Sequence, residues 1–126
     1  MGRKVSDGRS VRVTVPQNTT IEAGKFYLLD GFFGLAVQSV TTGPGETAEV
    51  ILICEQAEYE TSQITTSDAF NKGDSVYWND TTKLLTTQSG SGNRLVGRVT
   101  QAKDANNVIW FVLGPQVQLE VNENVL

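Results

Sequence analysis

Three glutamates, Glu55, Glu58 and Glu60, form the only carboxylate cluster in this sequence of 126 residues. On an extended strand Glu58 and Glu60 point to the same side. Paired carboxylates can hydrolyse glycosides or bind a hard cation such as Ca²⁺. The alternative is a charged edge strand that resists pairing with other strands. We favour the edge strand, because no further acid or glycine-rich ligand loop stands nearby, and we expect no metal or cofactor.

The remaining chemistry-bearing residue types argue against an enzyme. The sequence has no histidine, which removes the commonest general base and metal ligand and excludes Ser-His-Asp and Cys-His sites. Cys54 ends the apolar run 50–54, so we interpret it as a buried small side chain rather than a nucleophile. A single cysteine forms no intrachain disulfide, which fits assembly in a reducing cytoplasm. The loop 89–93 is glycine-rich but lacks the Lys-Ser/Thr pair of a phosphate cradle. We therefore predict no catalytic residues.

Charge is distributed unevenly along the chain. Residues 1–12 hold four basic side chains and one acidic one, whereas the remainder holds six basic and 13 acidic residues. The basic side chains are Arg3, Lys4, Arg9 and Arg12. We predict that residues 1–9 form a flexible basic arm, which either stays solvated or orders on an acidic partner. The acidic body would repel phosphates, so nucleic-acid binding is not expected. No apolar stretch is long enough to predict a membrane span, and residues 1–12 lack the apolar stretch of a signal peptide.

Aromatic residues offer two candidate surfaces. Trp78 and Trp110 could line a carbohydrate-binding face, but both stand among apolar neighbours and we expect them in the core. Phe32 and Phe33 are adjacent, so both cannot point inward from one strand. One of them is therefore a candidate subunit contact, although simple anchoring of the core is the interpretation we favour.

Turn residues that recur every 8–12 positions predict a chain built from short strands. Alternation of apolar and polar residues, or apolar runs, predicts strands over 10–15, 25–29, 33–40, 47–54, 57–61, 95–100, 108–113 and 116–121. The strand 47–54 becomes continuously apolar from Val50 onward, which predicts burial on both faces. One helical turn is a candidate at 66–71. The fold class is all-β: a small single-domain barrel or sandwich of about eight to ten short strands with at most one short helical turn.

The segment 72–87 carries the most specific pattern. Gly73 and Asp74 open a predicted β-hairpin in which Val76 and Trp78 share one face and Tyr77 takes the other. Asn79 to Thr82 are expected to form its turn, followed by a threonine-rich strand. A second segment, Gly92-Asn93-Arg94-Leu95-Val96-Gly97-Arg98-Val99, follows after a polar loop. This order of motifs resembles the capsid cement, or head decoration, proteins of tailed phages and prophages.

The resemblance implies a structural virion protein. Members of that family bind the exterior of the expanded head, bridge major capsid subunits and stabilise the shell. It implies a cement domain over 10–115 between the arm at 1–9 and a C-terminal strand or tail at 116–126, and it suggests a homotrimer on the outer capsid surface, made in the bacterial host cytoplasm. Candidate contacts with the capsid or other subunits are Arg3, Lys4, Arg9, Arg12, Phe32 and Phe33. The alternative is a carbohydrate- or receptor-binding module of a phage tail or fibre.

Overall fold

The computed structural model describes residues 2–117, which form eleven β-strands and no helix. The strands of the first half are β1 (Ser10–Val15), β2 (Thr20–Ile21), β3 (Phe26–Leu29), β4 (Phe32–Ala36), β5 (Val40–Thr41) and β6 (Ala48–Ile53). Those of the second half are β7 (Glu58–Thr61), β8 (Ser75–Asn79), β9 (Leu84–Thr86), β10 (Arg94–Gln101) and β11 (Ile109–Leu113). The all-β prediction is confirmed, with two very short strands bringing the number above the expected eight to ten.

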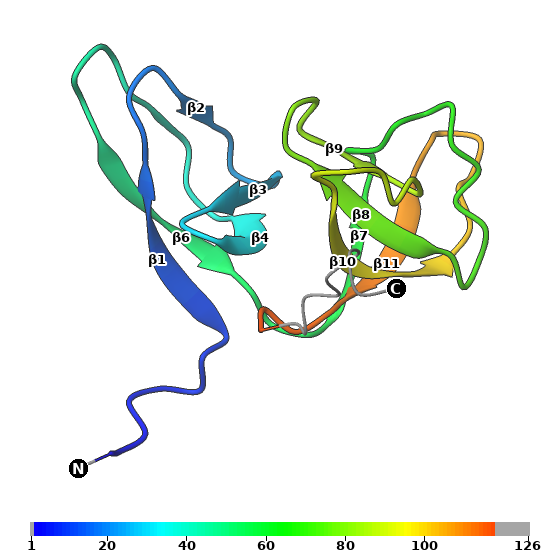
Figure 1. The fold of residues 1–126 in the computed structure, drawn as a ribbon, viewed down its shortest axis with the longest axis horizontal. Helices are drawn as coiled ribbons and strands as arrows, with labels where there is room; N and C mark the ends of the chain where they lie inside the picture. The colour runs from blue at the N-terminus through cyan, green and yellow to red at the C-terminus, as the bar shows by residue number, and fades with distance from the viewer. Residues whose placement is uncertain (1, 118–126) are drawn as a thin grey trace.

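The N-terminal half is a curled four-stranded sheet in the order β1-β6-β4-β3, with the β2–β5 pair beside it (Figure 1). Strand β1 has the predicted bounds and buries Val13 and Val15. Asp30 and Gly31 join β3 to β4 with positive φ angles of 52° and 82°, as a two-residue hairpin turn requires. Asp30 Oδ2 also accepts a hydrogen bond from the backbone N–H of Thr14 at 2.8 Å. The turn therefore covers part of the free edge of β1, and the sheet curls toward closure.

Strand β6 corrects one expectation. The predicted strand 47–54, apolar throughout from Val50, was expected to be buried on both faces. Only Val50 and Leu52 are buried within β6, while Ile51 and Ile53 are half-buried. Val50 and Leu52 pack with Val13 and Val15 inside the curl. The opposite face of β6 is covered only in part, so alternation in burial persists although residues 50–53 are all apolar.

The C-terminal half is a five-stranded antiparallel sheet in the order β7-β11-β10-β8-β9. Strand β7 lies at one edge, as its polar sequence predicted. Strands β8 and β9 form the expected hairpin, in which Trp78 pairs with Leu85 and both side chains are fully buried. Residues 80–83 connect the two strands, one position later than expected. The predicted C-terminal strand at 116–121 lies mostly outside the described residues, and Gln116 and Val117 are not in a strand.

The helical turn considered for 66–71 is not formed. Phe70 has a positive φ of 49° and its side chain is fully buried, so the core draws this segment inward. The Lys103 ammonium donates to the carbonyls of Thr66 and Asp68 at 2.7 and 2.6 Å. The Lys103 backbone N–H donates to the Phe70 carbonyl at 3.2 Å. These bonds satisfy backbone acceptors that a helix would have satisfied internally.

Two apolar clusters fill the molecule, and the larger one joins the halves. Phe26 and Phe33, from β3 and β4, belong to the same cluster as Trp78 and Phe111 of the second sheet. The ring centroids of Phe33 and Trp78 lie 5.1 Å apart, and those of Phe26 and Phe111 lie 5.4 Å apart. Figure 1 shows β3 and β4 on the side of the first half that faces the second. The two sheets therefore share a core and form a single domain.

Candidate functional site

The basic arm begins outside the folded body. Residues 2–9 are exposed and run away from the end of β1 (Figure 1), while Arg12 lies within β1 itself. Lys4 pairs with Asp7 at 2.7 Å, Arg9 with Glu55 at 3.8 Å, and Arg12 with Glu49 at 3.7 Å. All these side chains are at least half exposed, and such pairs contribute little to stability. The arm therefore presents its positive charge to solvent.

The phenylalanine pair divides as strand geometry requires. Phe33 is 1% exposed and stacks on Phe26 in the shared core, whereas Phe32 is 36% exposed. Phe33 is consequently removed from the candidate contacts, because its ring is enclosed by the protein itself. Phe32 follows the Asp30–Gly31 turn, which the bond from Thr14 to Asp30 holds beside β1. Two candidate contact residues, Arg12 on β1 and Phe32 on β4, therefore lie in the same N-terminal sheet.

The residues of the family-like motif have structural roles. Gly73 and Gly92 adopt positive φ angles of 93° and 85°, which favour glycine. Asp74 Oδ2 accepts from the backbone N–H of Asn71 at 2.8 Å and stabilises the turn before β8. Gly97 lies where β10 shifts register against β8, and a Cβ there would collide with the Val112 carbonyl. These positions shape the second sheet.

Trp78 and Val76 occupy the inner face of the same sheet, fully buried as predicted. The Trp78 indole N–H donates to Asp80 Oδ1 at 3.0 Å, which satisfies its one polar group. Tyr77 lies half-buried on the opposite face, opposite Leu95 in the register. Trp78 is therefore a core residue and offers nothing to the glycan-binding alternative.

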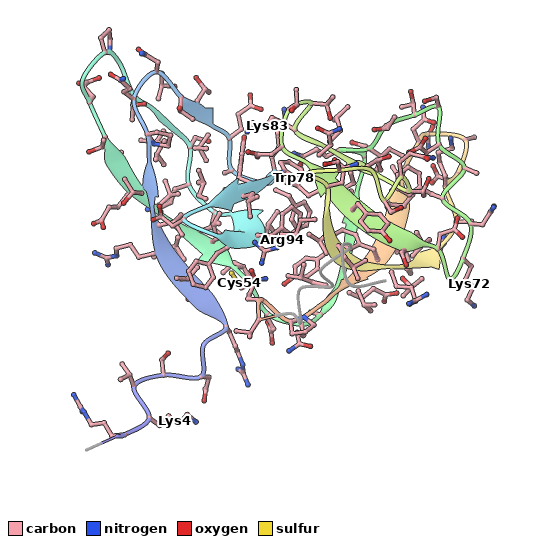
Figure 2. The ribbon with its side chains drawn as sticks, in the orientation of Figure 1. Lys4, Cys54, Lys72, Trp78, Lys83 and Arg94 are labelled. Carbon is pink, nitrogen blue, oxygen red and sulfur yellow. The ribbon has the colours of Figure 1, made fainter. Side chains whose placement is uncertain are left out.

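Side chains that the sequence did not single out join the two halves. Gln63 accepts from the backbone N–H of Phe26 at 2.8 Å and donates to the Phe26 carbonyl at 2.9 Å. Gln116 makes the same pair of bonds to Phe33, at 2.9 and 2.8 Å. Arg94 donates to the carbonyls of Gly31 and Gln116 at 2.5 and 3.2 Å, and Figure 2 shows it between the halves. These three residues hold the β3–β4 hairpin against the second sheet.

The outer face of the second sheet is unexpectedly apolar. Trp110 is 38% exposed, and Leu95, Val112 and Val117 are also exposed. This corrects the expectation that Trp110 is a core residue. In β11 the buried residues are Ile109, Phe111 and Leu113, so alternation places Trp110 on the other face. Because residues 109–113 are all apolar, the sequence contains no alternation that could have identified this face.

The three glutamates have separate partners. Glu58 Oε2 accepts from the Thr100 hydroxyl at 2.5 Å, and Glu60 Oε2 accepts from the Trp110 indole N–H at 3.1 Å. Glu55 pairs with Arg9 as described above. Within residues 2–117 no group of three His, Cys, Asp or Glu side chains is placed to hold a metal ion. This arrangement fits the edge-strand interpretation of Glu58 and Glu60.

Cys54 is 6% exposed and unpaired, in agreement with the sequence-based interpretation. Burial raises the pKa of its thiol above the ordinary value of 9.0, although the positive charge of Arg94 opposes this shift. In the part of the chain that the structure describes, no helix has the length and apolar character to span a membrane.

Comparison with known proteins gives one family match. A family model described as "Phage cement protein" matches residues 5–115. No curated protein sequence matches the chain. Among solved structures, the N base of the head fiber gp8.5 in bacteriophage phi29 is similar, with 12% sequence identity and a TM-score of 0.47. That similarity covers 89% of this chain and 99% of the other. Because the family match spans nearly all of the described fold, the chain belongs to the phage cement protein family, a family of capsid-associated structural proteins and not an enzyme class.

Proposed function

We propose that this protein binds the exterior of the expanded phage head, bridges neighbouring major capsid proteins and stabilises the shell. The observation that carries the proposal is the family match over residues 5–115. The fold supports it with a body whose halves share one core and with a basic arm that projects from β1. Many copies on a symmetric lattice would turn modest individual contacts into large collective stabilisation.

We place the first capsid contacts on the arm and on Phe32. The arm offers Arg3, Lys4 and Arg9, whose charges attract an acidic surface at short range and are screened by salt. Phe32 adds an exposed apolar group at the hairpin turn beside β1. Arg12 stays a secondary candidate, because it lies within β1 and not on the projecting arm. Binding should therefore weaken as ionic strength rises.

Co-sedimentation with matched capsids that lack the protein tests the proposal. Saturable binding to expanded shells but not to unexpanded ones, with a raised disruption temperature of the pelleted shells, is the expected result. Failure to bind expanded shells would contradict the cement role.

A matched pair of double variants tests the arm. Arg3→Gln/Lys4→Gln removes two charges from the arm, while Lys72→Gln/Lys83→Gln removes two from the other half of the molecule; Figure 2 shows Lys4 far from Lys72 and Lys83. We expect weaker capsid binding only for the first variant. Equal occupancy for both variants would show that the arm is not the contact.

We also propose that the protein assembles as a homotrimer on the outer capsid surface after synthesis in the host cytoplasm. This follows from the resemblance to decoration proteins set out above. Sedimentation equilibrium of the purified protein and the spacing of its density on decorated capsids would measure it. If the protein were a monomer both in solution and on the shell, the trimer would be refuted, while the proposal that it binds the capsid would still stand.

A glycan-binding role is the second candidate, and the exposed ring of Trp110 favours it. Its indole N–H is held by Glu60, which fixes the ring on the outer face of the second sheet. Glycans stack on exposed aromatic rings of this kind. A glycan screen with the native protein and Trp110→Ala tests the idea: binding lost in the variant would support it, and absence of binding by the native protein would exclude it.

A further inference from the structure

The same reactive dipeptide occurs at two places with opposite surroundings. Asp-Gly stands at Asp7-Gly8 on the arm and at Asp30-Gly31 in the turn between β3 and β4. Glycine has no side chain to shield its backbone nitrogen, so that nitrogen can approach the carboxyl group of the preceding aspartate closely. An Asp-Gly pair is therefore a site of spontaneous backbone isomerisation wherever the chain is free to bend into a ring.

The chemistry of this isomerisation needs only water. The glycine nitrogen attacks Cγ of the aspartate and forms a C–N bond, and one carboxyl oxygen leaves as water with the acid proton and the amide proton. A second water molecule then opens the resulting succinimide ring at one of its two carbonyls. Opening at the former side-chain carbonyl restores aspartate, whereas opening at the main-chain carbonyl gives isoaspartate, whose main chain runs through Cβ and Cγ.

The fold holds Asp30-Gly31 away from this reaction. Asp30 Oδ2 accepts a hydrogen bond from the Thr14 N–H at 2.8 Å, which ties the carboxylate to β1. Strands β3 and β4 pair on both sides of the turn, and Arg94 donates to the Gly31 carbonyl. Ring closure would require the turn to open first, so its rate is reduced by the small population of the open form.

Asp7-Gly8 lies on a segment that belongs to no strand, and its side chains point into solvent. The Asp7 carboxylate pairs with Lys4, and the Gly8 N–H donates to Ser6 Oγ at 3.1 Å. Both partners lie on the arm itself, which Figure 2 shows at Lys4 well away from the folded body. The pair with Lys4 is more than half exposed and contributes little. Neither bond ties Asp7 or Gly8 to the body, so ring closure needs no opening of the fold.

We propose that Asp7 is a site of isoaspartate formation and that Asp30 is protected from it. The modification keeps the negative charge of residue 7 but adds one carbon atom to the main chain. It therefore changes the spacing between Arg9 and the charges of Arg3 and Lys4. Isomerisation at Asp7 occurs in the free protein and is independent of capsid binding, so its test does not bear on the cement role.

Peptide mapping of the incubated full chain tests both halves of the proposal. Electron-transfer fragmentation in a mass spectrometer distinguishes isoaspartate from aspartate at each position. In the native protein we expect isoaspartate at Asp7 to accumulate at least about tenfold faster than at Asp30, because the turn must open first. In urea Asp30 should react faster than in the native protein and approach the rate of Asp7. Equal native rates, or no isoaspartate at Asp7 while the urea-unfolded chain forms it, would overturn the proposal.

Three substitutions on the arm, outside the core, test the route through the Gly8 nitrogen. Asp7→Glu keeps the charge but would need a larger ring, so the isomerised product at this position should be lost. Gly8→Ala places a methyl group beside the attacking nitrogen and should lower the rate at Asp7. Gly2→Ala is the matched control and should leave that rate unchanged. A rate at Asp7 that is the same in Gly8→Ala as in Gly2→Ala would refute ring closure through Gly8.

Discussion

Replacing Gln63 tests whether side-chain bonds hold the two halves together. Its amide replaces a neighbouring strand at the free edge of β3, where it accepts from the Phe26 N–H and donates to the Phe26 carbonyl. It also donates to the carbonyl of Lys83 at 3.1 Å. Gln63→Ala removes all three bonds and leaves part-buried backbone groups of Phe26 without their partner. The halves should then separate more easily.

The size of the effect follows from the number of bonds. Each contributes about 1 kcal/mol net, so three give an upper value of about 3 kcal/mol. The carbonyl of Lys83 is exposed and regains water, which lowers the expected loss for Gln63→Ala to roughly 2 kcal/mol. For a domain of this size the corresponding fall in Tm is about 8 °C. Urea unfolding followed by the fluorescence of the buried Trp78 measures the change.

Two further variants make the reasoning refutable. Gln63→Glu keeps the size of the side chain but places an oxygen acceptor against two carbonyls, so it should cost at least as much as alanine. Gln17→Ala removes a single exposed bond from the Gly45 N–H and should cost less than about 0.5 kcal/mol. If Gln63→Ala and Gln17→Ala lowered the free energy of unfolding equally, the bridging role of Gln63 would be wrong.

Three other measurements probe the fold. Gly97→Ala should cost about 1–3 kcal/mol in urea unfolding, because its methyl group meets the Val112 carbonyl, whereas Gly90→Ala has room and should be nearly neutral. Burial raises the pKa of Asp68, but hydrogen bonds from Thr86, Thr87 and Gln88 together outweigh this effect and hold the pKa below 3.8. The ionised carboxylate therefore stabilises the folded protein above pH 3.8, and this stabilisation is lost as the pH falls through the folded-state pKa. Asp68→Asn should therefore be destabilising at neutral pH and progressively less so in acid, and a difference independent of pH would contradict this. The raised pKa and burial of Cys54 predict slow alkylation of the native thiol near neutral pH and fast alkylation in urea, measured by mass spectrometry.

Local signals were sufficient for most strands. Strand β1 alternates strictly and has its predicted bounds, and the Asp30–Gly31 turn and the 72–87 hairpin follow from turn residues with the required backbone angles. The same rules predicted that Phe32 and Phe33 face opposite sides. Where the sequence was uniformly apolar, at 50–54 and 108–113, periodicity carried no information. The half-buried face of β6 and the exposed face of β11 were therefore assigned to the core.

Long-range contacts explain what could not be predicted. Gln63 and Gln116 bond to residues 37 and 83 positions away, and no local pattern distinguishes them from surface glutamines. Phe70 adopts a positive φ and no helical backbone angle, and its ring packs in the shared core. That packing depends on both assembled sheets, so no local sequence pattern indicates it. The uneven distribution of charge was sufficient to predict the basic arm at residues 1–9. The proposal that the arm binds a capsid protein rests on the family and not on the charge.

The geometry of β1 suits a protein that carries load through its arm. If the arm binds the shell as proposed, tension enters the body at Ser10, where the arm runs on from the end of β1 (Figure 1). Strand β1 pairs with β6 over six residue pairs, from Ser10–Ile53 to Val15–Ala48, and the Cys54 N–H donates to the Arg9 carbonyl at 2.8 Å. Antiparallel hydrogen bonds lie perpendicular to the strands, so a pull along β1 strains these bonds together in shear. The load then passes through β6 to β4, whose Phe33 is bonded to Gln116 and packed on Trp78. A capsid contact at the arm would thus be mechanically continuous with the core that joins the two halves.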